Sequence, residues 1–424
     1  MAGLTGDNAP CPKSLIVVIK LGTSSIVDEK THEPLLPILS LIVSTAVKLR
    51  KDGHKVVIVS SGAIGVGLQR MDQDKRPKHL HALQALAAVG QCRLLSLWDS
   101  LFSHYRQPIA QILLTRNDIA DRTRYLNAQN TMAELLDMGV IPIVNENDTV
   151  AVAEIKFGDN DTLSAITAGM VHADFLFLMT DVDCLYDKNP RSNPDAKPIE
   201  VVKDISSVQA DVSSAGSSLG TGGMATKIVA AKLATSVGVM TVITRSSRPD
   251  NITQIVRHVQ DQSRSSQQAE NSVANGSASV PLHTRFLPSP EPIRDRYFWL
   301  LYGLAPHGTL YVDAGAHRAL AHKAGLLPVG VLDVEGSFAS HEAVRVVVVE
   351  RSSEPGPDGK LWHGTPQEVG RALVNYSSSE IQRIKGHRSN EIHSILDYGD
   401  SDYVADRDNV SLLLHESRPV TPTQ

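Results

Sequence analysis

The feature that most constrains the fold of this chain is an alternation of short apolar runs with longer amphipathic segments between Ser14 and about Arg257. Each apolar run is rich in valine and isoleucine and lacks polar alternation, which is typical of strands buried on both faces of a parallel sheet. The predicted strands are LIVVIK (15–20), KVVIVS (55–60), PIAQILLT (108–115), VIPIVNE (140–146), DFLFLMT (174–180) and VMTVIT (239–244).

Helical patterns fill the intervals between these runs. The predicted helices cover residues 34–53, 79–105, 124–139, 161–173 and 224–238. Gly53, Gly139 and Gly238 stand where three of these helices would end, as helix C-caps. The alternation predicts an α/β fold, a three-layer α/β/α sandwich with a mostly parallel sheet. Such sheets bind ligands outside the carboxyl ends of their strands, so a site is expected in the loops that follow the strands.

The composition changes after Arg257. Residues 258–290 are rich in serine, glutamine and asparagine and have little to bury, which predicts a flexible polar linker. Glycine-punctuated apolar runs such as GTLYVDAG and AVRVVVVE then predict a small strand-rich domain over 291–400. The predicted organisation is therefore a first domain at 13–257, the linker, the second domain, and a tail at 401–424.

Charge and cysteine content limit the class of protein. The formal net charge of −5 gives no electrostatic reason to expect nucleic acid or an anionic membrane as the main partner. The 3 cysteines lie far apart and form no C-x-x-C pair, which argues against a disulfide framework and a thiolate zinc site. The first residues have no apolar signal core, and the apolar run after them is too short to cross a bilayer. We therefore expect a cytoplasmic protein without a membrane partner.

The densest glycine cluster is LGTGGMATKI (219–228). It is not a Walker-type phosphate loop, because Lys227 follows Thr226 and precedes Ile228 instead of standing between a glycine and a Ser or Thr. It fits G-x-G-x-x-A, but a polar run precedes it where a dinucleotide-binding motif requires a strand. On local evidence the segment is either a phosphate-binding loop of another kind or a plain connection.

Polar side chains gather in the loops after the predicted strands. Lys20 is either a ligand-facing lysine or an edge lysine, and SSGAIGVG (60–67) is either an anion-binding helix start or a tight turn. Asp161 is either a ligand group or a helix N-cap. The other polar residues at these positions are Asn145, Glu146, Asn147, Asp148, Asp159, Asn160, Thr180, Asp181 and Asp183.

The combination of two lysines, glycine amides and carboxylates at one sheet edge is what phosphoryl transfer requires, because the charge on the transferred group must be neutralised in place. The carboxylates suit Mg²⁺, and they could equally hold an ammonium group or fix the lysines. No serine–histidine–acid set and no general base is evident. A hydroxyl acceptor would need a base, whereas a carboxylate acceptor with a pKa of about 4.3 is already ionised. This favours a kinase that makes an acyl phosphate.

At these residues the sequence resembles the glutamate 5-kinases, which are amino-acid kinases with a C-terminal PUA domain. The resemblance rests on VIKLGTSS, IVSSGAIGVG, AAVGQCRL, LLTRNDIADRTRYLNA, PIVNENDTVAVAEIKFGDNDTLSA, TDVDCLYDKNPRSNPDA and GTGGMATK, in that order. It implies the amino-acid-kinase fold followed by a small all-β PUA-like barrel. It also implies ATP-dependent phosphorylation of the γ-carboxylate of L-glutamate, the first step of proline biosynthesis, with feedback inhibition by proline.

The resemblance assigns roles to residues of this chain. Lys20 and Lys227 would flank the transferred phosphoryl group, with Asp161 as a third catalytic residue. Glutamate would contact Ser61, Asp148 and Asn160. The residues implied to bind ATP are Lys20, Thr180, Asp181, Thr221, Gly222, Gly223, Met224, Ala225, Thr226 and Lys227. Asp159 and Asp161 would hold Mg²⁺ or orient the lysines. Many bacterial members carry a glycine where this chain has Cys184, which would alter the nucleotide loop if that position needs a positive φ.

The resemblance also implies partners, namely ATP and Mg²⁺, a homo-oligomer, and a downstream glutamyl-phosphate reductase that receives the unstable product. Kinases for aspartate, N-acetylglutamate or carbamate are same-fold alternatives, and NENDTVAVAEIK speaks against them. RNA binding through the PUA-like domain is a hypothesis of another class. Residues 291–400 hold 11 Lys and Arg against 14 Asp and Glu, so the basic surface typical of an RNA binder is not expected.

Overall fold

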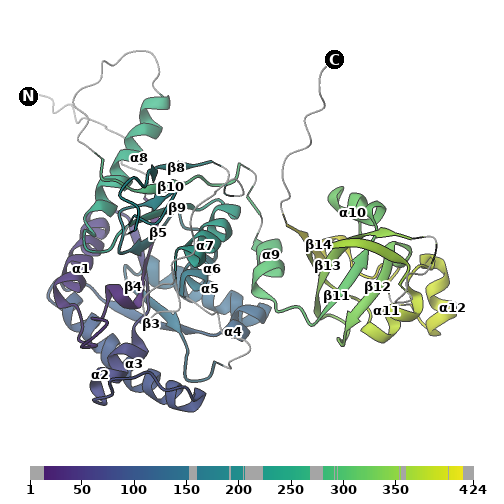
Figure 1. Cartoon of the computed structure of the whole chain (residues 1–424), viewed down its shortest axis with the longest axis horizontal. Coiled ribbons are helices and arrows are strands. Elements are labelled where there is room, and N and C mark those ends of the chain that lie inside the picture. The colour runs from purple at the N-terminus through teal and green to yellow at the C-terminus, as the bar shows by residue number, and fades with distance from the viewer. Residues whose placement is uncertain are drawn as a thin grey trace, which may run out of the picture. The chain divides into compact units, whose positions relative to one another are not determined.

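A computed structural model divides the chain into two compact units (Figure 1). The first unit comprises Met1–Asp118 and Arg122–Pro292, and the second comprises Ile119–Asp121 and Ile293–Gln424. The structure describes residues 14–151, 160–190, 192–203, 205, 223–267, 280–290, 292–293, 295–352, 354, 360–399 and 401–413.

The first unit is built on an eight-stranded sheet in the order β3-β4-β2-β1-β5-β9-β10-β8. Neighbouring strands from β3 to β9 in this order are parallel, and β10 is antiparallel to β9. The six parallel strands are β1 (Ile16–Leu21), β2 (Lys55–Ser60), β3 (Ile109–Leu114), β4 (Ile141–Glu146), β5 (Phe175–Thr180) and β9 (Met240–Arg245). All six strands expected from the apolar runs are thereby confirmed.

Helices connect these strands. They are α1 (Leu36–Lys51), α2 (Ala63–Arg70), α3 (Leu80–Ser103), α4 (Arg116–Ala120), α5 (Arg122–Asp137), α6 (Asn160–Met170), α7 (Met224–Ser236) and α8 (Asn251–Gln267). Gly53, Gly139 and Gly238 follow α1, α5 and α7 with φ of 89°, 80° and 87°. Because side chains rarely adopt such angles, glycine at these positions ends each helix at little cost, as predicted.

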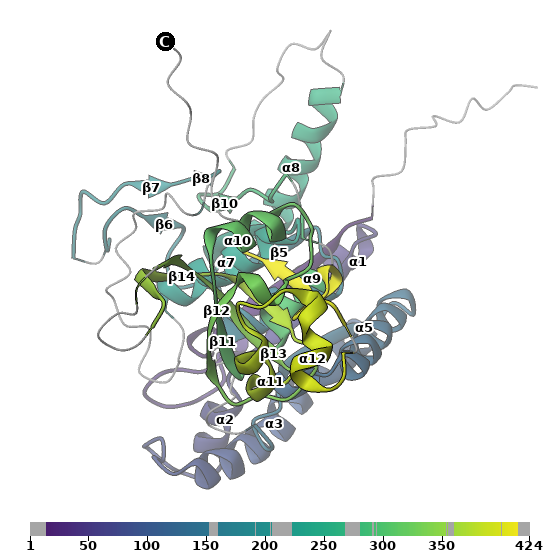
Figure 2. The same ribbon diagram turned by 90° about the vertical axis from the view of Figure 1, so that its right-hand side faces the viewer.

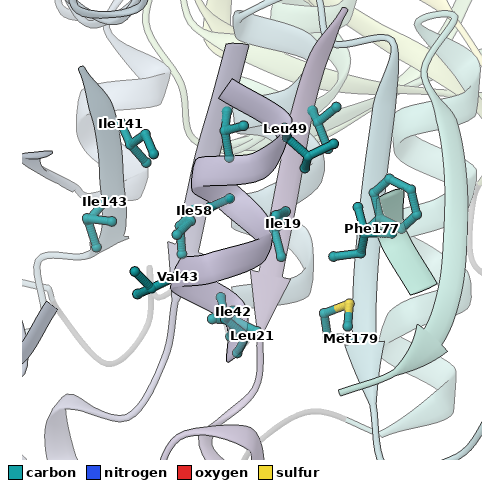
Figure 3. Packing of buried hydrophobic residues seen from close by; sticks show 14 of the residues in the cluster. Ile19, Leu21, Ile42, Val43, Leu49, Ile58, Ile141, Ile143, Phe177 and Met179 are labelled. Atoms are coloured by element: carbon teal, nitrogen blue, oxygen red, sulfur yellow. The ribbon is translucent and has the colours of Figure 1, made fainter. Parts of the chain in front are cut away.

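The core of this unit follows from the strand register. Ile19 pairs with Ile58 of β2 and with Phe177 of β5, so these side chains form one row on the same face of the sheet (Figure 3). Ile42 and Val43 of α1 pack against this row and are almost completely buried. Helices α3 and α8 contribute to the same cluster, whereas α6 and α7 lie on the other face of the sheet (Figure 1). The predicted three-layer arrangement is confirmed.

The predicted linker at 258–290 is wrong at both of its ends. Helix α8 continues to Gln267, and β10 (Thr284–Phe286) joins the main sheet between β9 and β8 (Val201–Val202). A helix whose last turns are rich in Ser and Gln has the composition of a linker, and a three-residue strand shows too little periodicity to predict. A hairpin of β6 (Leu185–Tyr186) and β7 (Pro198–Ile199) was also not expected.

The second unit contains a five-stranded sheet in the order β12-β11-β13-β14-β15. Strands β11 to β14 are labelled in Figure 2. The strands are β11 (Gly308–Val312), β12 (Val331–Gly336), β13 (Ala343–Arg351), β14 (Trp362–Leu373) and β15 (Val410–Leu412). Buried residues such as Leu310, Val346 and Ile381 form a separate core. The unit is not all-β, because it also contains α9 (Asp295–Phe298), α10 (Ala314–Ala321), α11 (Ser378–Ile384) and α12 (Ile392–Leu396).

None of the helices in the described part of the chain combines the length and the apolar character needed to cross a membrane.

Candidate active site

A cluster of three charged side chains lies at the carboxyl edge of the sheet. Lys20 is the penultimate residue of β1, Asp161 is in the first turn of α6, and Lys227 is in the first turn of α7. The Asp161 carboxylate contacts both ammonium groups, with Oδ1 2.5 Å from Lys20 Nζ and Oδ2 3.4 Å from Lys227 Nζ. All three residues are buried, with exposed fractions of 3%, 0% and 7% in this order. The structure thus brings together the three residues expected to be catalytic.

The charges of this cluster depend on one another. Burial alone would raise the pKa of Asp161, but Lys20 and Lys227 outweigh burial and lower this pKa to about 2. Burial and the neighbouring Lys20 lower the pKa of Lys227 from its ordinary value of 10.5, and Asp161 opposes them. Asp161 is therefore firmly ionised near neutral pH, and its charge permits two buried ammonium groups to lie close together.

Thr226 links the start of α7 to the same carboxylate. Its hydroxyl lies 2.7 Å from Asp161 Oδ2 and 2.8 Å from the Gly223 carbonyl oxygen, and its single proton can serve one of them at a time. The Gly223 amide donates to Thr226 Oγ1 at 3.0 Å. Gly223 to Lys227 are described, and Met224 and Ala225 begin the helix. Thr221 and Gly222 lie outside the described residues.

A second group of polar side chains lies beside this cluster. Asn160 donates through Nδ2 to Ser61 Oγ at 2.8 Å and to Asn145 Oδ1 at 3.0 Å. These residues come from α6, from the loop after β2 and from the end of β4, so the fold unites three segments that are distant in sequence. Asp148, the other residue expected to contact glutamate, lies two residues beyond the end of β4 and is half-buried.

The residues expected to hold the nucleotide after β5 adjoin one another. Thr180 ends β5, and its hydroxyl donates to Asp181 Oδ1 at 3.1 Å. Arg245, the register partner of Thr180 on β9, forms a two-bond ion pair with Asp183 at 2.7 and 2.8 Å. Cys184 follows this pair, is buried, and does not adopt a positive φ. The cysteine therefore introduces no backbone strain into this loop.

The glycines of SSGAIGVG serve helix packing more than loop formation. Only Gly62 has a positive φ, 101°, and α2 begins directly after it. A Cβ added at Gly67 would lie 2.1 Å from the Leu86 carbonyl oxygen, and one added at Gly90 would lie 1.7 Å from the Ala63 carbonyl oxygen. Small residues at these points allow α2 and α3 to approach each other closely behind Ser61.

Of the two carboxylates expected to hold Mg²⁺, Asp161 lies among the described residues. No group of three or more His, Cys, Asp or Glu side chains suited to a metal occurs among them. Both carboxylate oxygens of Asp161 already contact lysine or threonine, which favours lysine orientation over metal binding for this residue. Asp159, the other expected metal ligand, lies outside the described residues.

Two side chains of α3 support the edge of the sheet and were not singled out from the sequence. Gln91 accepts a 2.8 Å hydrogen bond from Asn145 Nδ2, and Trp98 Nε1 donates to Ser60 Oγ at 3.2 Å. Trp98 is buried and Gln91 is half-buried, and the other buried positions of this helix are apolar or glycine. Their seven-residue spacing, which places them on one face of the helix, is the signal that could have identified them.

Comparisons with known proteins agree with this architecture. The amino acid kinase family matches residues 15–246, and the PUA domain matches residues 308–396. A probable glutamate 5-kinase of Schizosaccharomyces pombe is 58% identical over 399 residues, 93% of each chain. A glutamate 5-kinase of Rippkaea orientalis is 46% identical, over 93% of this chain and 98% of that protein. An uncharacterized protein of Saccharomyces cerevisiae is also 46% identical, over 94% of this chain and 98% of that protein.

Among solved structures, a carbamate kinase from Giardia lamblia bound to AMP-PNP aligns with 66% of this chain and 100% of its own, with a TM-score of 0.45 and 18% identity. The matched sequence family covers more than half of the chain, and the sequence relatives extend over nearly all of it. The chain therefore belongs to the amino acid kinase family and carries a C-terminal PUA domain.

Proposed function

We propose that the chain transfers the γ-phosphoryl group of ATP to the γ-carboxylate of L-glutamate and so makes γ-glutamyl 5-phosphate for proline biosynthesis. The observation that carries the proposal is the Lys20–Asp161–Lys227 cluster at the carboxyl edge of a parallel sheet. Its chemistry suits phosphoryl transfer, and relatives that match nearly the whole chain are named as glutamate 5-kinases.

The proposed reaction is a direct displacement. A carboxylate oxygen of glutamate forms a bond to the γ-phosphorus, the bond from that phosphorus to the bridging oxygen breaks, and ADP leaves with the electron pair. No proton has to move, because the attacking carboxylate is ionised near neutral pH. Lys20 and Lys227 would neutralise the charge on the transferred group, and Asp161 would hold both ammonium groups in place beforehand.

The two substrates would occupy neighbouring parts of the edge. Ser61 and Asn160 would contact glutamate, and Asp148 supplies the anionic partner that an α-ammonium group requires. Thr180, Asp181 and the start of α7 would hold ATP, together with Thr221 and Gly222, which lie outside the described residues. Mg²⁺ typically binds such sites through one or two carboxylates and the substrate phosphates. When bound there, Mg²⁺ would neutralise part of the charge on the phosphates.

Product trapping tests this function. The purified chain is incubated with ATP, Mg²⁺ and glutamate, and the acyl phosphate is captured with hydroxylamine as a hydroxamate. We expect hydroxamate with glutamate and only background with aspartate, N-acetylglutamate or carbamate. Hydroxamate with another acid and none with glutamate would refute the substrate assignment.

Variants of α7 test the phosphoryl role. Lys227→Ala should lower kcat by roughly two to three orders of magnitude while the Kd for glutamate changes little, because Lys227 would act mainly in the transition state. Lys232→Ala is the matched control, since Lys232 is an exposed lysine of the same helix. A Lys227→Ala variant with raised KM and unchanged kcat would contradict the role.

Three further expectations accompany the proposal, namely a homo-oligomer, inhibition by proline, and delivery of the product to a glutamyl-phosphate reductase. Light scattering and initial rates measured with added proline address the first two. A rise in reductase rate when the two enzymes are mixed would support the third.

A further inference from the structure

One face of α3 carries polar side chains at seven-residue intervals, a spacing of about two helical turns. Gln84 donates to the Ala151 carbonyl oxygen at 3.1 Å, Gln91 accepts from Asn145, and Trp98 donates to Ser60. Each partner lies at the end of a strand or in the loop beyond it. The helix therefore has a hydrogen-bonding face directed at the same edge of the sheet as the charged cluster.

The hydrogen bonds fix which way each amide points. The Glu146 backbone N–H, which can only donate, bonds Asn145 Oδ1 at 2.9 Å. The Asn145 NH₂ group must then face away from Glu146, and it donates to Gln91 Oε1. Asn145 is only 3% exposed, so without Gln91 this NH₂ group would lose its protein acceptor in a largely buried position.

The orientation of the Asn145 amide in turn fixes the orientation of the Asn160 amide. Asn145 Oδ1 accepts from Asn160 Nδ2, and the Asn160 NH₂ group also donates to Ser61 Oγ. Both hydrogens of this amide are committed to protein acceptors, which leaves Asn160 Oδ1 to accept from a bound ligand. The order Gln91, Asn145, Asn160, Ser61 is thus a continuous chain of hydrogen bonds from α3 to the acceptor side of the site.

We propose that Gln91 is a positioning residue for the acceptor substrate, because its Oε1 atom fixes the amide of Asn145 and, through it, the orientation of Asn160 beside Ser61. The inference rests on the proposed function, since it takes Asn160 and Ser61 as groups that contact glutamate. The chain of contacts does not include Thr180 or Asp181. Loss of the Gln91 acceptor should therefore affect glutamate and leave ATP binding nearly unchanged.

Steady-state kinetics of two Gln91 variants test this role. Gln91→Met keeps the side-chain length and removes the oxygen acceptor, and we expect the glutamate KM to rise roughly tenfold because a buried donor loses its partner. The ATP KM and kcat should stay within about twofold of wild type, the pattern of lost ground-state binding. Gln91→Glu retains an oxygen acceptor for Asn145 Nδ2 and should restore most of the glutamate affinity.

Trp98→Phe is a second test variant of the same helix face, because it removes the N–H donor to Ser60 and keeps an aromatic ring in the core. It should also raise the glutamate KM more than the ATP KM. Gln254→Met is the control, since Gln254 is an exposed, hydrogen-bonded glutamine on α8. It should change neither constant.

The outcomes separate the inference from the function. A wild-type chain that forms no hydroxamate with glutamate would refute the proposed function. An active wild type whose glutamate KM is unaffected by Gln91→Met, or whose two KM values rise equally, would overturn the role of Gln91 alone. If Gln91→Met does not fold, Gln91→Ser, which is too short to reach Asn145, carries the same expectation.

Discussion

At the scale of single residues, the charge balance of the candidate site depends on Asp161. Asp161→Asn would keep the shape of the side chain and leave Lys20 and Lys227 buried without their shared carboxylate. Removing one partner of a buried ion pair costs about 3–5 kcal/mol, so we expect the free energy of unfolding in urea to fall by about that amount. The kcat should fall as well, because the lysines lose their fixed positions.

Asp137→Asn is the control for this variant. Asp137 forms an ion pair with Lys55, and the Asp137 side chain is 66% exposed while that of Lys55 is 33% exposed. Its removal should change the free energy of unfolding by less than about 1 kcal/mol. Equal losses for Asp137→Asn and Asp161→Asn would contradict the importance given to the buried cluster.

The lowered pKa of Lys227 predicts how kcat changes at alkaline pH. Its pKa is lowered below 10.5, first by burial and then by Lys20, and a neutral Lys227 cannot neutralise the transferred phosphoryl group. The kcat should therefore decline with rising pH at a lower value than for a free lysine. A profile of kcat against pH that stays flat up to pH 10.5 would argue against this role.

The contribution of Lys227 to the free energy of unfolding should rise over the same pH range in which kcat falls. Because the folded pKa of Lys227 lies below the unfolded one, the unfolded chain binds more protons between the two values, and this residue's contribution to the free energy of unfolding rises with pH. The difference in unfolding free energy between wild type and Lys227→Met isolates that contribution. If kcat falls with rising pH while this difference in unfolding free energy does not fall, unfolding is not the cause of the lost activity.

At the scale of elements, the sequence was most informative where strands are buried on both faces. Continuous Val and Ile runs identified β1, β2, β3, β4, β5 and β9, because such runs have little alternative to a central strand. Strand β10 was missed because Thr284 and Phe286 point inward from a stretch that is otherwise polar and too short for a periodic signal.

Some residues of the candidate site could likewise be predicted from the sequence, and others could not. Lys20, Asp161 and Lys227 could be predicted because strand ends of a parallel sheet meet at one edge. The spacing of Gln91 and Trp98 places them on one helix face, but their partners Asn145 and Ser60 could not be predicted, since these contacts depend on where the folded chain places α3. The expected contacts to ATP and glutamate stay predictions.

Strand β10 also makes a testable element-scale prediction. Thr284 is fully buried, and its hydroxyl accepts from the Leu185 amide at 2.7 Å and donates to the Ile199 carbonyl oxygen at 2.5 Å. It thereby joins both strands of the β6–β7 hairpin to the main sheet. Thr284→Val should cost about 1–3 kcal/mol by leaving a buried N–H unpaired, measurable as a lower free energy of unfolding.

The kinetic consequence should concern the nucleotide, because the hairpin begins just after Asp183 and the loop expected to hold ATP. Thr284→Val should raise the ATP KM more than the glutamate KM, and Thr284→Ser, which keeps the hydroxyl, should resemble wild type. A larger effect on glutamate would show that the hairpin does not shape the nucleotide side.

At the scale of the whole molecule, the position of β10 decides where the first unit can be cut. A chain that stops at Arg257 keeps the six parallel strands and loses β10 together with the end of α8, whereas one that stops at Pro292 keeps both. We expect the longer fragment to retain hydroxamate formation and the shorter one to lose it. Circular dichroism and thermal unfolding of both fragments would show whether the loss accompanies unfolding.

The second unit should make the full chain unfold at a higher temperature than the 1–292 fragment. Trp299 Nε1 donates to the Ile119 carbonyl oxygen at 2.8 Å, and both residues belong to the second unit. Stopping at Pro292 leaves Ile119–Asp121 without the rest of that unit, so this fragment should unfold at a lower temperature than the full chain. An inactive but well-folded 1–292 fragment would instead give the second unit a direct part in the reaction.

The late position of β10 in the chain has a consequence for synthesis on the ribosome. Residues up to Arg245 complete the parallel strands, but β9 has an unpaired edge until Thr284–Phe286 has emerged. During that interval the nascent chain exposes backbone donors and acceptors that can pair with another polypeptide. Slow translation between these points would prolong the exposure, and we expect it to lower the share of chains that reach the native state.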